Sequence, residues 1–369
     1  MKPERAIRQT DGYPVRRTLL VHGDPHRNAL GNGGWSAKYD WDFPRMSNFE
    51  FNSTVILGET SFPGGPEVLY NCGMRKGGSP WTRSDANTLD RLRWKSPGDA
   101  LYRNRSKTGV DNDAAGGSRF HNRITRHFLY LLGYPVPDHE FIQQIVNEDA
   151  PRIGDDMEPT DTDFFDRAYA DGGEGQLFEI DDAWFMYDQA PNSPGAENRL
   201  DAGSVTGRWA LTDWTNPAIP PTPSADSPIF FHGNWPVRFP EDRYDYASLA
   251  SLIKTTVTGA TTSQIWRDQV SRQLDIERAA LYAAVRGYIG EWDNFTLNRG
   301  KNGYFYRRPM DGKFEFHHWD SDLAFQNTGE GFLGTAGGLG WTNLTGRPWF
   351  RQRVNFYLTE LVTKYTKDS

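Results

Sequence analysis

The chain contains a single cysteine, Cys72, in 369 residues. One thiol cannot form a disulfide within the chain, so we expect Cys72 to be a small buried apolar residue. The sequence also lacks any apolar run long enough to cross a bilayer, and residues 1–17 have no apolar core of the signal-peptide type. We therefore expect no membrane span in this chain, and no signal peptide is visible in it.

Dense basic runs are missing as well. Lys and Arg number 41 against 48 Asp and Glu, which gives a formal net charge of −7 at pH 7. Proteins that bind nucleic acids by neutralising phosphates need a basic surface, so we expect no nucleic-acid partner. Aromatic residues are abundant, at 14% of the chain, and are accompanied by 37 Gly and 23 Pro. This composition predicts an aromatic core connected by many loops.

The patterns along the chain predict an α+β protein. Residues 48–75 have the pattern of paired strands, and apolar residues between 118 and 132 recur at helical spacing. The strongest helical pattern runs from about Asp275 to Gly290. We expect a β-rich lobe with a nucleotide-facing loop at residues 1–190 and a Pro-rich connection at residues 191–228. Residues 229–369 are expected to form a mainly helical lobe with the catalytic loop and a metal-binding hairpin.

A kinase-like order of parts begins at Asp293, which is followed five residues later by Asn298. Phosphoryl transfer needs a carboxylate beside the acceptor hydroxyl and oxygen ligands for magnesium. Asp293 can supply the carboxylate beside the acceptor hydroxyl, and Asn298 can supply one oxygen ligand for the metal. Their spacing matches the catalytic loop of protein kinases, although Glu291 and Trp292 stand where that loop has His-Arg.

A predicted hairpin leads to a second acidic pair, Asp320 and Asp322. Aromatic-rich runs at 304–306 and 314–316 flank the turn dipeptide Asp311-Gly312. A hairpin returns its second strand to where the first began, so we expect the acidic pair to lie beside the first two side chains. If the chain stays extended, both carboxylates project to one side and face a common metal. The alternative is an acidic loop whose charges are only solvated.

Three further patterns have weaker chemical meaning. The glycine-rich segment 75–81, with Lys76, Gly78 and Ser79, has the form of a loop that lets backbone amides approach phosphates, but also of an ordinary turn. Adjacent histidines at 317–318 point in opposite directions on a strand and have no third ligand nearby, which disfavours zinc. The glycines of 329–340 lack the ending of a P-loop.

These residues resemble those of the CotH-type atypical protein kinases, a family named after a spore-coat kinase. The resemblance is strongest over AALYAAVRGYIGEWDNFTLNRGKNGYFYRRPMDGKFEFHHWDSDLAF, where Trp-Asp, Arg-Gly-Lys-Asn, the Tyr-x-Tyr strand and Trp-Asp-x-Asp occur in family order. It extends from about Val68, through YNCGMRKGGSPW and DMEPTDTDFF, to Phe325.

The resemblance implies a divergent bilobal protein-kinase-like fold that uses ATP with Mg²⁺ or Mn²⁺. It implies transfer of phosphate to Ser or Thr of a protein acceptor, in an extracytoplasmic or cell-surface location. By position, Asp293 is the catalytic aspartate and Asp320 the metal-binding aspartate. Further expected metal ligands are Asn298, Asn302 and Asp322. Expected nucleotide-binding residues are Lys76, Gly78, Ser79, Arg93, Lys95 and Glu158, the last by orienting a basic residue.

Three departures from the family pattern concern the cations that contact phosphate. Gly77 stands at a family arginine, Glu179 at a family lysine, and Gln326 at the last glycine of the final motif. A nucleotide-binding pseudokinase therefore remains an alternative. So does a non-catalytic surface or structural module that binds calcium through acidic loops. A carbohydrate-cleaving enzyme with paired carboxylates has no specific motif in its favour.

Four Asn-x-Ser/Thr glycosylation sequons occur, at Asn52, Asn104, Asn294 and Asn343. A glycan on Asn294 would lie against the expected catalytic aspartate. Either Asn294 is not modified in the source of this protein, or the catalytic interpretation is wrong.

Overall fold

The computed structural model describes residues 17–22, 50–58, 67–76, 91–111, 120–146, 150–171, 173–180, 237–240, 245–258, 262–291, 294–296, 302–326, 333 and 341–366. The described residues form two compact units. The first contains those up to Arg123 and those of Pro137–Pro159. The second contains Ile124–Val136 and the described residues from Thr160 onward.

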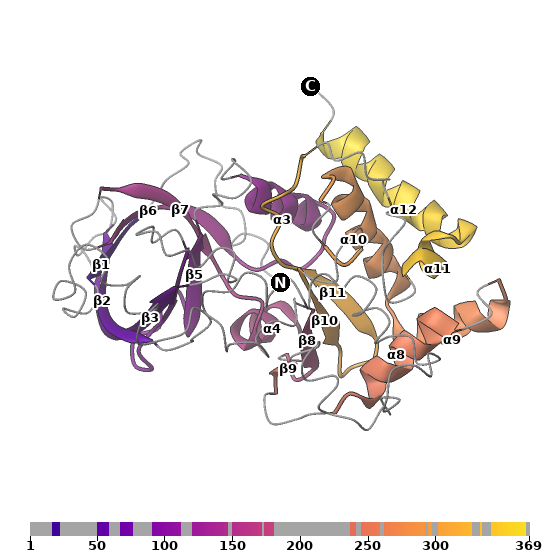
Figure 1. The fold of residues 1–369 in the computed structure, drawn as a ribbon, viewed down its shortest axis with the longest axis horizontal. Coiled ribbons are helices and arrows are strands. Elements are labelled where there is room, and N and C mark those ends of the chain that lie inside the picture. Colours follow the sequence, from indigo (N-terminus) through magenta and orange to yellow (C-terminus); the bar gives the residue numbers. More distant parts are fainter. Residues whose placement is uncertain are drawn as a thin grey trace, which may run out of the picture. The chain divides into compact units, whose positions relative to one another are not determined.

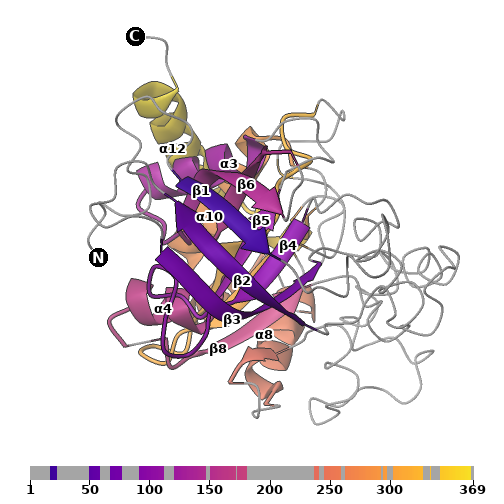
Figure 2. The ribbon, with the colours of Figure 1, turned by 90° about the vertical axis from the view of Figure 1, so that its left-hand side faces the viewer.

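The first unit is built around a closed β-barrel with strand order β1-β2-β3-β4-β5-β7-β6. Neighbouring strands pair antiparallel, except that β1 and β6 close the barrel in parallel. Figure 1 shows the ring of strands, and Figure 2 shows β1, β2 and β3 side by side in its wall. The strands are Arg17–His22, Phe51–Gly58, Glu67–Lys76, Arg91–Lys95, Lys107–Asp111, His139–Val146 and Arg152–Met157, β1 to β7 in chain order.

Alternating residues of these strands fill the barrel with apolar side chains. Leu92 and Trp94 on β4 are buried, whereas Lys95 is exposed, as expected for a strand with one face on a core. Cys72 on β3 is fully buried, and burial raises the pKa of its thiol to about 11. The expectation of a buried, apolar cysteine is therefore confirmed.

Buried charges in the same unit centre on Asp156 of β7. Its carboxylate accepts hydrogen bonds from the Tyr102 hydroxyl and the Thr108 hydroxyl, each at 2.8 Å. The guanidinium groups of Arg103 and Arg105 each lie 3.1 Å from it. Asp156 and Arg105 are almost completely inaccessible to solvent, so each provides the compensation that the other needs in a buried position.

The second unit combines a four-stranded sheet, in the order β11-β10-β8-β9, with helices (Figure 1). All three neighbouring strand pairs are antiparallel. The strands β8 to β11 are Gln176–Ile180, Val237–Phe239, Gly303–Arg307 and Phe314–His318. The helices are α3 (His121–Leu131, which begins in the first unit), α4 (Thr162–Ala168), α8 (Ala247–Thr258), α9 (Gln264–Gln273), α10 (Ile276–Tyr288), α11 (Trp341–Thr345) and α12 (Pro348–Glu360), followed by a π-helical turn (Leu361–Tyr365).

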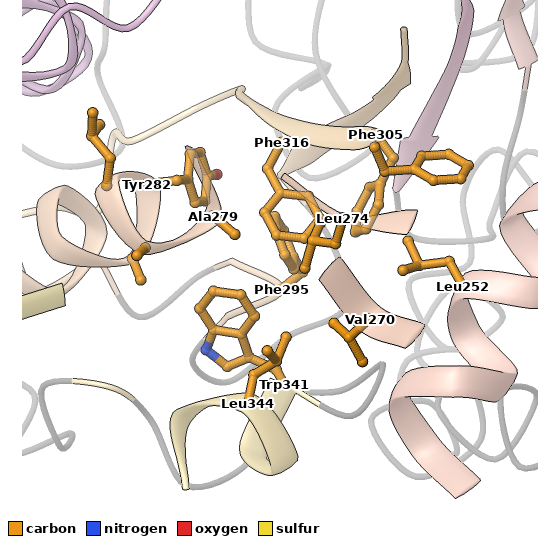
Figure 3. Close-up of a cluster of buried hydrophobic side chains, with 14 of the residues drawn as sticks. Leu252, Val270, Leu274, Ala279, Tyr282, Phe295, Phe305, Phe316, Trp341 and Leu344 are labelled. Atoms are coloured by element: carbon orange, nitrogen blue, oxygen red, sulfur yellow. The ribbon is translucent and has the colours of Figure 1, made fainter. Parts of the chain in front are cut away.

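Helix α10 lies at the centre of this unit. Asp275 caps its N-terminus by accepting a hydrogen bond from the Arg278 N–H, and every residue from Ala279 to Arg286 is buried. A helix that is buried all round is a core helix. Figure 3 shows the apolar side chains gathered near it, including Leu274, Tyr282, Phe295, Phe316 and Trp341.

The observed elements agree with most of the predicted ones. The mixed α+β class, the paired strands β2 and β3, the helix at 275–290 and the hairpin at 303–318 are confirmed. Strand β8 pairs with β10, so this part of the expected first lobe belongs to the second unit. No helix in the described ranges combines the length and apolar character of a membrane-crossing segment.

Candidate active site

The hairpin of β10 and β11 brings the candidate metal ligands to one end. Gly303 pairs with His318, and Arg307 pairs with Phe314 at the turn. Gly312 has a φ of 69°, the left-handed conformation that a tight turn requires and that glycine adopts without strain. Asn302 precedes the first strand and Asp320 follows the second, so both lie at the open end of the hairpin.

The chain after the hairpin returns to the C-terminal end of α10. The backbone N–H of Phe325 donates to the carbonyl oxygen of Ile289 at 2.6 Å. At the start of this returning segment, the Arg286 guanidinium lies 3.4 Å from the carbonyl oxygen of Asp320. The segment with Asp320 and Asp322 is therefore fastened to the helix that leads to Asp293. Asp293 and Asn298 themselves lie outside the described residues.

Residues on both sides of Asp293 are fixed in the core. Glu291 and Asn294 are fully buried, and Phe295 is 2% exposed. The Phe295 ring packs against Phe305 and Phe316, with centroids 5.1 Å away in each case. These two phenylalanines belong to the hairpin strands, so the segment after Asp293 contacts the hairpin directly (Figure 3).

A side-chain turn follows Asp293 immediately. The side-chain oxygen of Asn294 accepts a hydrogen bond from the Thr296 N–H at 2.8 Å, and its amide donates to the carbonyl oxygen of Glu291. Asn and Asp commonly stabilise such turns by bonding to the backbone two residues on. The sequon asparagine is therefore a structural residue.

The backbone around Asp320 differs from the extended form that strand alternation requires. Strand β11 ends at His318, and Asp320 has a φ of 50°. Non-glycine residues adopt this left-handed region rarely and at some cost, and such residues cluster at functional sites. The expectation that the chain stays extended through Asp320 and Asp322 is wrong, because the chain turns here. Asn302 also has a positive φ, 60°, and both Asn302 and Asp322 are buried.

Three residues that no sequence pattern singled out for this role hold this turn: Arg286, His318 and Ser321. Ser321 is fully buried, with its Oγ atom 2.7 Å from Nη1 of Arg286 and 2.6 Å from Nε2 of His318. The only sequence signal was a lone arginine in the otherwise apolar run AALYAAVRGY. A charged residue on a helix that is buried all round needs partners.

The candidate ligands are oxygen donors, which suit Mg²⁺ or Mn²⁺ better than zinc. Asp320, Asp322 and Asn302 offer two carboxylates and an amide. Within the described part of the chain, no group of three or more His, Cys, Asp or Glu side chains is placed to hold a metal ion. The further expected ligand Asn298 lies outside that part.

The candidate nucleotide-binding residues belong to the first unit. Lys95 is half exposed and forms an ion pair with Glu50 at 3.2 Å. Arg93 lies so close over the neighbouring strand that a Cβ atom on Gly109 would be 1.5 Å from its Nη1 atom. Lys76 ends strand β3.

Glu158 is fully buried and accepts a hydrogen bond from the Asp138 N–H at 2.8 Å. Its expected role of orienting a basic residue stays a prediction. Gly78 and Ser79 lie outside the described residues.

Glu179, which stands at a family lysine, has a basic partner. It lies on β8 opposite Tyr304 of β10, and Arg238 of β9 forms an ion pair with it. Gly303 pairs with Ile180 next to this position, so the ion pair lies at the same end of the sheet as Asn302.

Residues 224–364 match the family model described as CotH kinase protein. The resemblance seen in the sequence is thereby confirmed for this segment, and the match indicates a kinase-like function. It includes α10, the hairpin and every candidate catalytic and metal-binding residue, but none of the candidate nucleotide-binding residues of the first unit. No curated protein matches the chain.

Proposed function

We propose that this protein transfers the γ-phosphate of ATP to Ser or Thr of a protein acceptor, as a divergent kinase with a bilobal kinase-like fold. The single observation that carries the proposal is the return of the Asp320–Asp322 turn to the end of α10. The Phe325–Ile289 hydrogen bond and the packing of Phe295 against the hairpin support the proposal, because they join the hairpin to the described residues on either side of Asp293.

Each candidate residue has one role in this proposal. Asp293 accepts the proton of the acceptor hydroxyl, and Asp320 binds the divalent cation. Bound Mg²⁺ or Mn²⁺ would neutralise charge on the phosphates of ATP. The further ligands are Asn298, Asn302 and Asp322. All are oxygen donors, as Mg²⁺ prefers.

The first unit is proposed to contact the nucleotide. Basic side chains stabilise phosphate charge, and glycine-rich backbone allows close approach of amides. The residues proposed for these contacts are Lys76, Gly78, Ser79, Arg93, Lys95 and Glu158. The acceptor protein is proposed to be extracytoplasmic or at the cell surface, like the kinase itself.

Two alternatives are supported by specific observations. A nucleotide-binding pseudokinase is favoured by Glu179 at a lysine position, although Arg238 restores a positive charge next to it. A calcium-binding module is favoured by the oxygen-rich open end of the hairpin, because calcium also takes carboxylate and amide oxygens.

Thermal unfolding with added ligands tests the proposal. A ligand that binds only the folded state raises the unfolding midpoint. We expect ATP to stabilise the protein only when Mg²⁺ or Mn²⁺ is present. Stabilisation by Ca²⁺ without nucleotide, and none by ATP with Mg²⁺, would instead support the calcium-binding module.

A further inference from the structure

Arg286 is a buried cation whose hydrogen bonds go to the Asp320–Asp322 turn and whose guanidinium also lies over the Tyr282 ring. It is fully buried on the last turns of α10. Within the described residues it forms no ion pair with a carboxylate. Its hydrogen bonds go from Nη1 to Ser321 Oγ at 2.7 Å and to the Asp320 carbonyl oxygen at 3.4 Å. Burying a charge is costly, so these contacts indicate a role beyond packing.

Ser321 joins three parts of the site. Its hydroxyl lies between the Arg286 guanidinium and Nε2 of His318, the last residue of β11. Its carbonyl oxygen accepts a hydrogen bond from the Ala324 N–H at 3.1 Å. The residue between the two candidate metal ligands is thus held through both its side chain and its backbone.

The segment from Asp320 to Phe325 begins and ends with a residue in a left-handed conformation, Asp320 at 50° and Phe325 at 61°. Each such non-glycine residue costs about 1–3 kcal/mol and persists only where the surroundings hold it. Phe325 is held by Ile289, and Asp320 by Arg286. Both ends of this segment are therefore bonded to α10 or to its C-cap residue, Ile289.

We propose that Arg286, acting through Ser321, is a positioning residue that sets the divalent-metal affinity of this turn. This inference rests on the proposed function, because it takes Asp320 and Asp322 as metal ligands. Side chains that orient metal ligands without touching the metal commonly alter its affinity when they are replaced.

The test is Mn²⁺ affinity, measured by electron paramagnetic resonance, for wild type, Ser321→Ala and Arg286→Lys. Ser321→Ala removes the central hydroxyl with the least change in volume. Arg286→Lys keeps the charge but changes the length and shape of the side chain that places Nη1 against both Ser321 and Asp320. We expect each to weaken Mn²⁺ binding by about 10- to 100-fold, as replacement of residues that orient metal ligands typically does.

A kinetic measurement separates positioning from general damage. We expect the Mn²⁺ concentration for half-maximal phosphate transfer to rise in both variants, with kcat at saturating Mn²⁺ within about threefold of wild type. Thr256→Val is a matched control. It removes another buried hydroxyl of the same unit, one that bonds to the carbonyl oxygen of Leu252 on α8, and it should leave both values unchanged.

The outcomes distinguish this inference from the proposed function. If wild type binds Mn²⁺ and the folded Ser321→Ala protein binds it equally well, the positioning role is wrong and the kinase proposal stands. If wild type binds neither Mn²⁺ nor Mg²⁺, in the presence or absence of ATP, the kinase proposal fails and this inference fails with it. Circular dichroism establishes that each variant is folded, and Ser321→Ala decides the matter if Arg286→Lys does not fold.

Discussion

The backbone N–H of Phe325 donates to the carbonyl oxygen of Ile289 at 2.6 Å, which joins the chain after the hairpin to the end of α10. This contact fixes the position of the segment that carries the two candidate metal ligands. An acidic loop that is only solvated would not be expected to form this backbone hydrogen bond or to contact a buried arginine. The turn that carries Asp320 is instead fixed to the helix that leads to Asp293.

The buried carboxylate of Asp156 is expected to stabilise the first unit strongly. Burial opposes ionisation, but nearby arginines and hydrogen bonds hold the pKa of Asp156 below its usual value. Replacement by Asn leaves Arg105 and Arg103 with less compensation. Breaking a buried pair in this way costs about 3–5 kcal/mol. We expect Asp156→Asn to lower the free energy of unfolding of this unit by about that amount, measured by urea denaturation.

The exposed ion pair of Asp311 with Arg308, 2.7 Å apart, provides a comparison. Exposed pairs contribute about 1 kcal/mol or less, so Asp311→Asn should have a much smaller effect. Equal effects for the two variants would show that the network around Asp156 adds nothing beyond a surface pair.

The second unit should lose stability in mild acid because of His317. Burial lowers its pKa, although a hydrogen bond to Glu315 at 2.9 Å opposes this shift. Its surroundings also include the rings of Tyr134, Phe164, Phe165, Tyr169 and Tyr306 and the charges of Arg278 and Arg308.

The unfolded chain binds a proton at this histidine near pH 6.5, before the folded state does. The contribution of His317 to stability is therefore complete above about pH 6.5 and is lost as the pH falls toward the lowered pKa. His317→Gln should reduce the slope of unfolding free energy against pH between 7 and 5, by at most about 1.4 kcal/mol per pH unit. An unchanged slope would contradict this account.

Asn294 should carry no glycan on folded protein, even from a host that glycosylates its secreted proteins. Its amide nitrogen donates to the Glu291 carbonyl oxygen, and the side chain is fully buried. The exposed side chains of Asn52 and Asn104 are free of this restriction. Peptide mass spectrometry after enzymatic deglycosylation reads each position separately. Glycan found at Asn294 on folded, secreted protein would contradict the buried position of this side chain and its hydrogen bond to Glu291.

Local patterns predicted the fold elements well. The all-round apolar character of α10 and the Asp311-Gly312 turn were visible because each depends on residues close in sequence. The closure of the barrel by β1 and β6, and the pairing of β8 with β10, depend on contacts between distant segments. No local pattern contains that information.

The sequence suggests which residues belong to the candidate site, but it does not predict their backbone conformation. The positive φ of Asp320 and the buried hydrogen bonds of Ser321 arise from tertiary contacts with Arg286. Asp156 likewise differs from a solvated aspartate because it is buried. The local sequence Gly-Asp-Asp-Met does not predict that burial. Strand alternation therefore did not predict the left-handed conformation of Asp320.

The most direct measurement is incorporation of labelled phosphate from ATP with Mn²⁺, into the protein itself or a generic Ser/Thr acceptor. We expect incorporation by wild type and by the control Asp268→Ala, whose side chain lies on the exposed face of α9. We expect none by Asp293→Ala or Asp320→Ala, with both variants folded. Full incorporation by both folded variants, or none by wild type, would contradict the account.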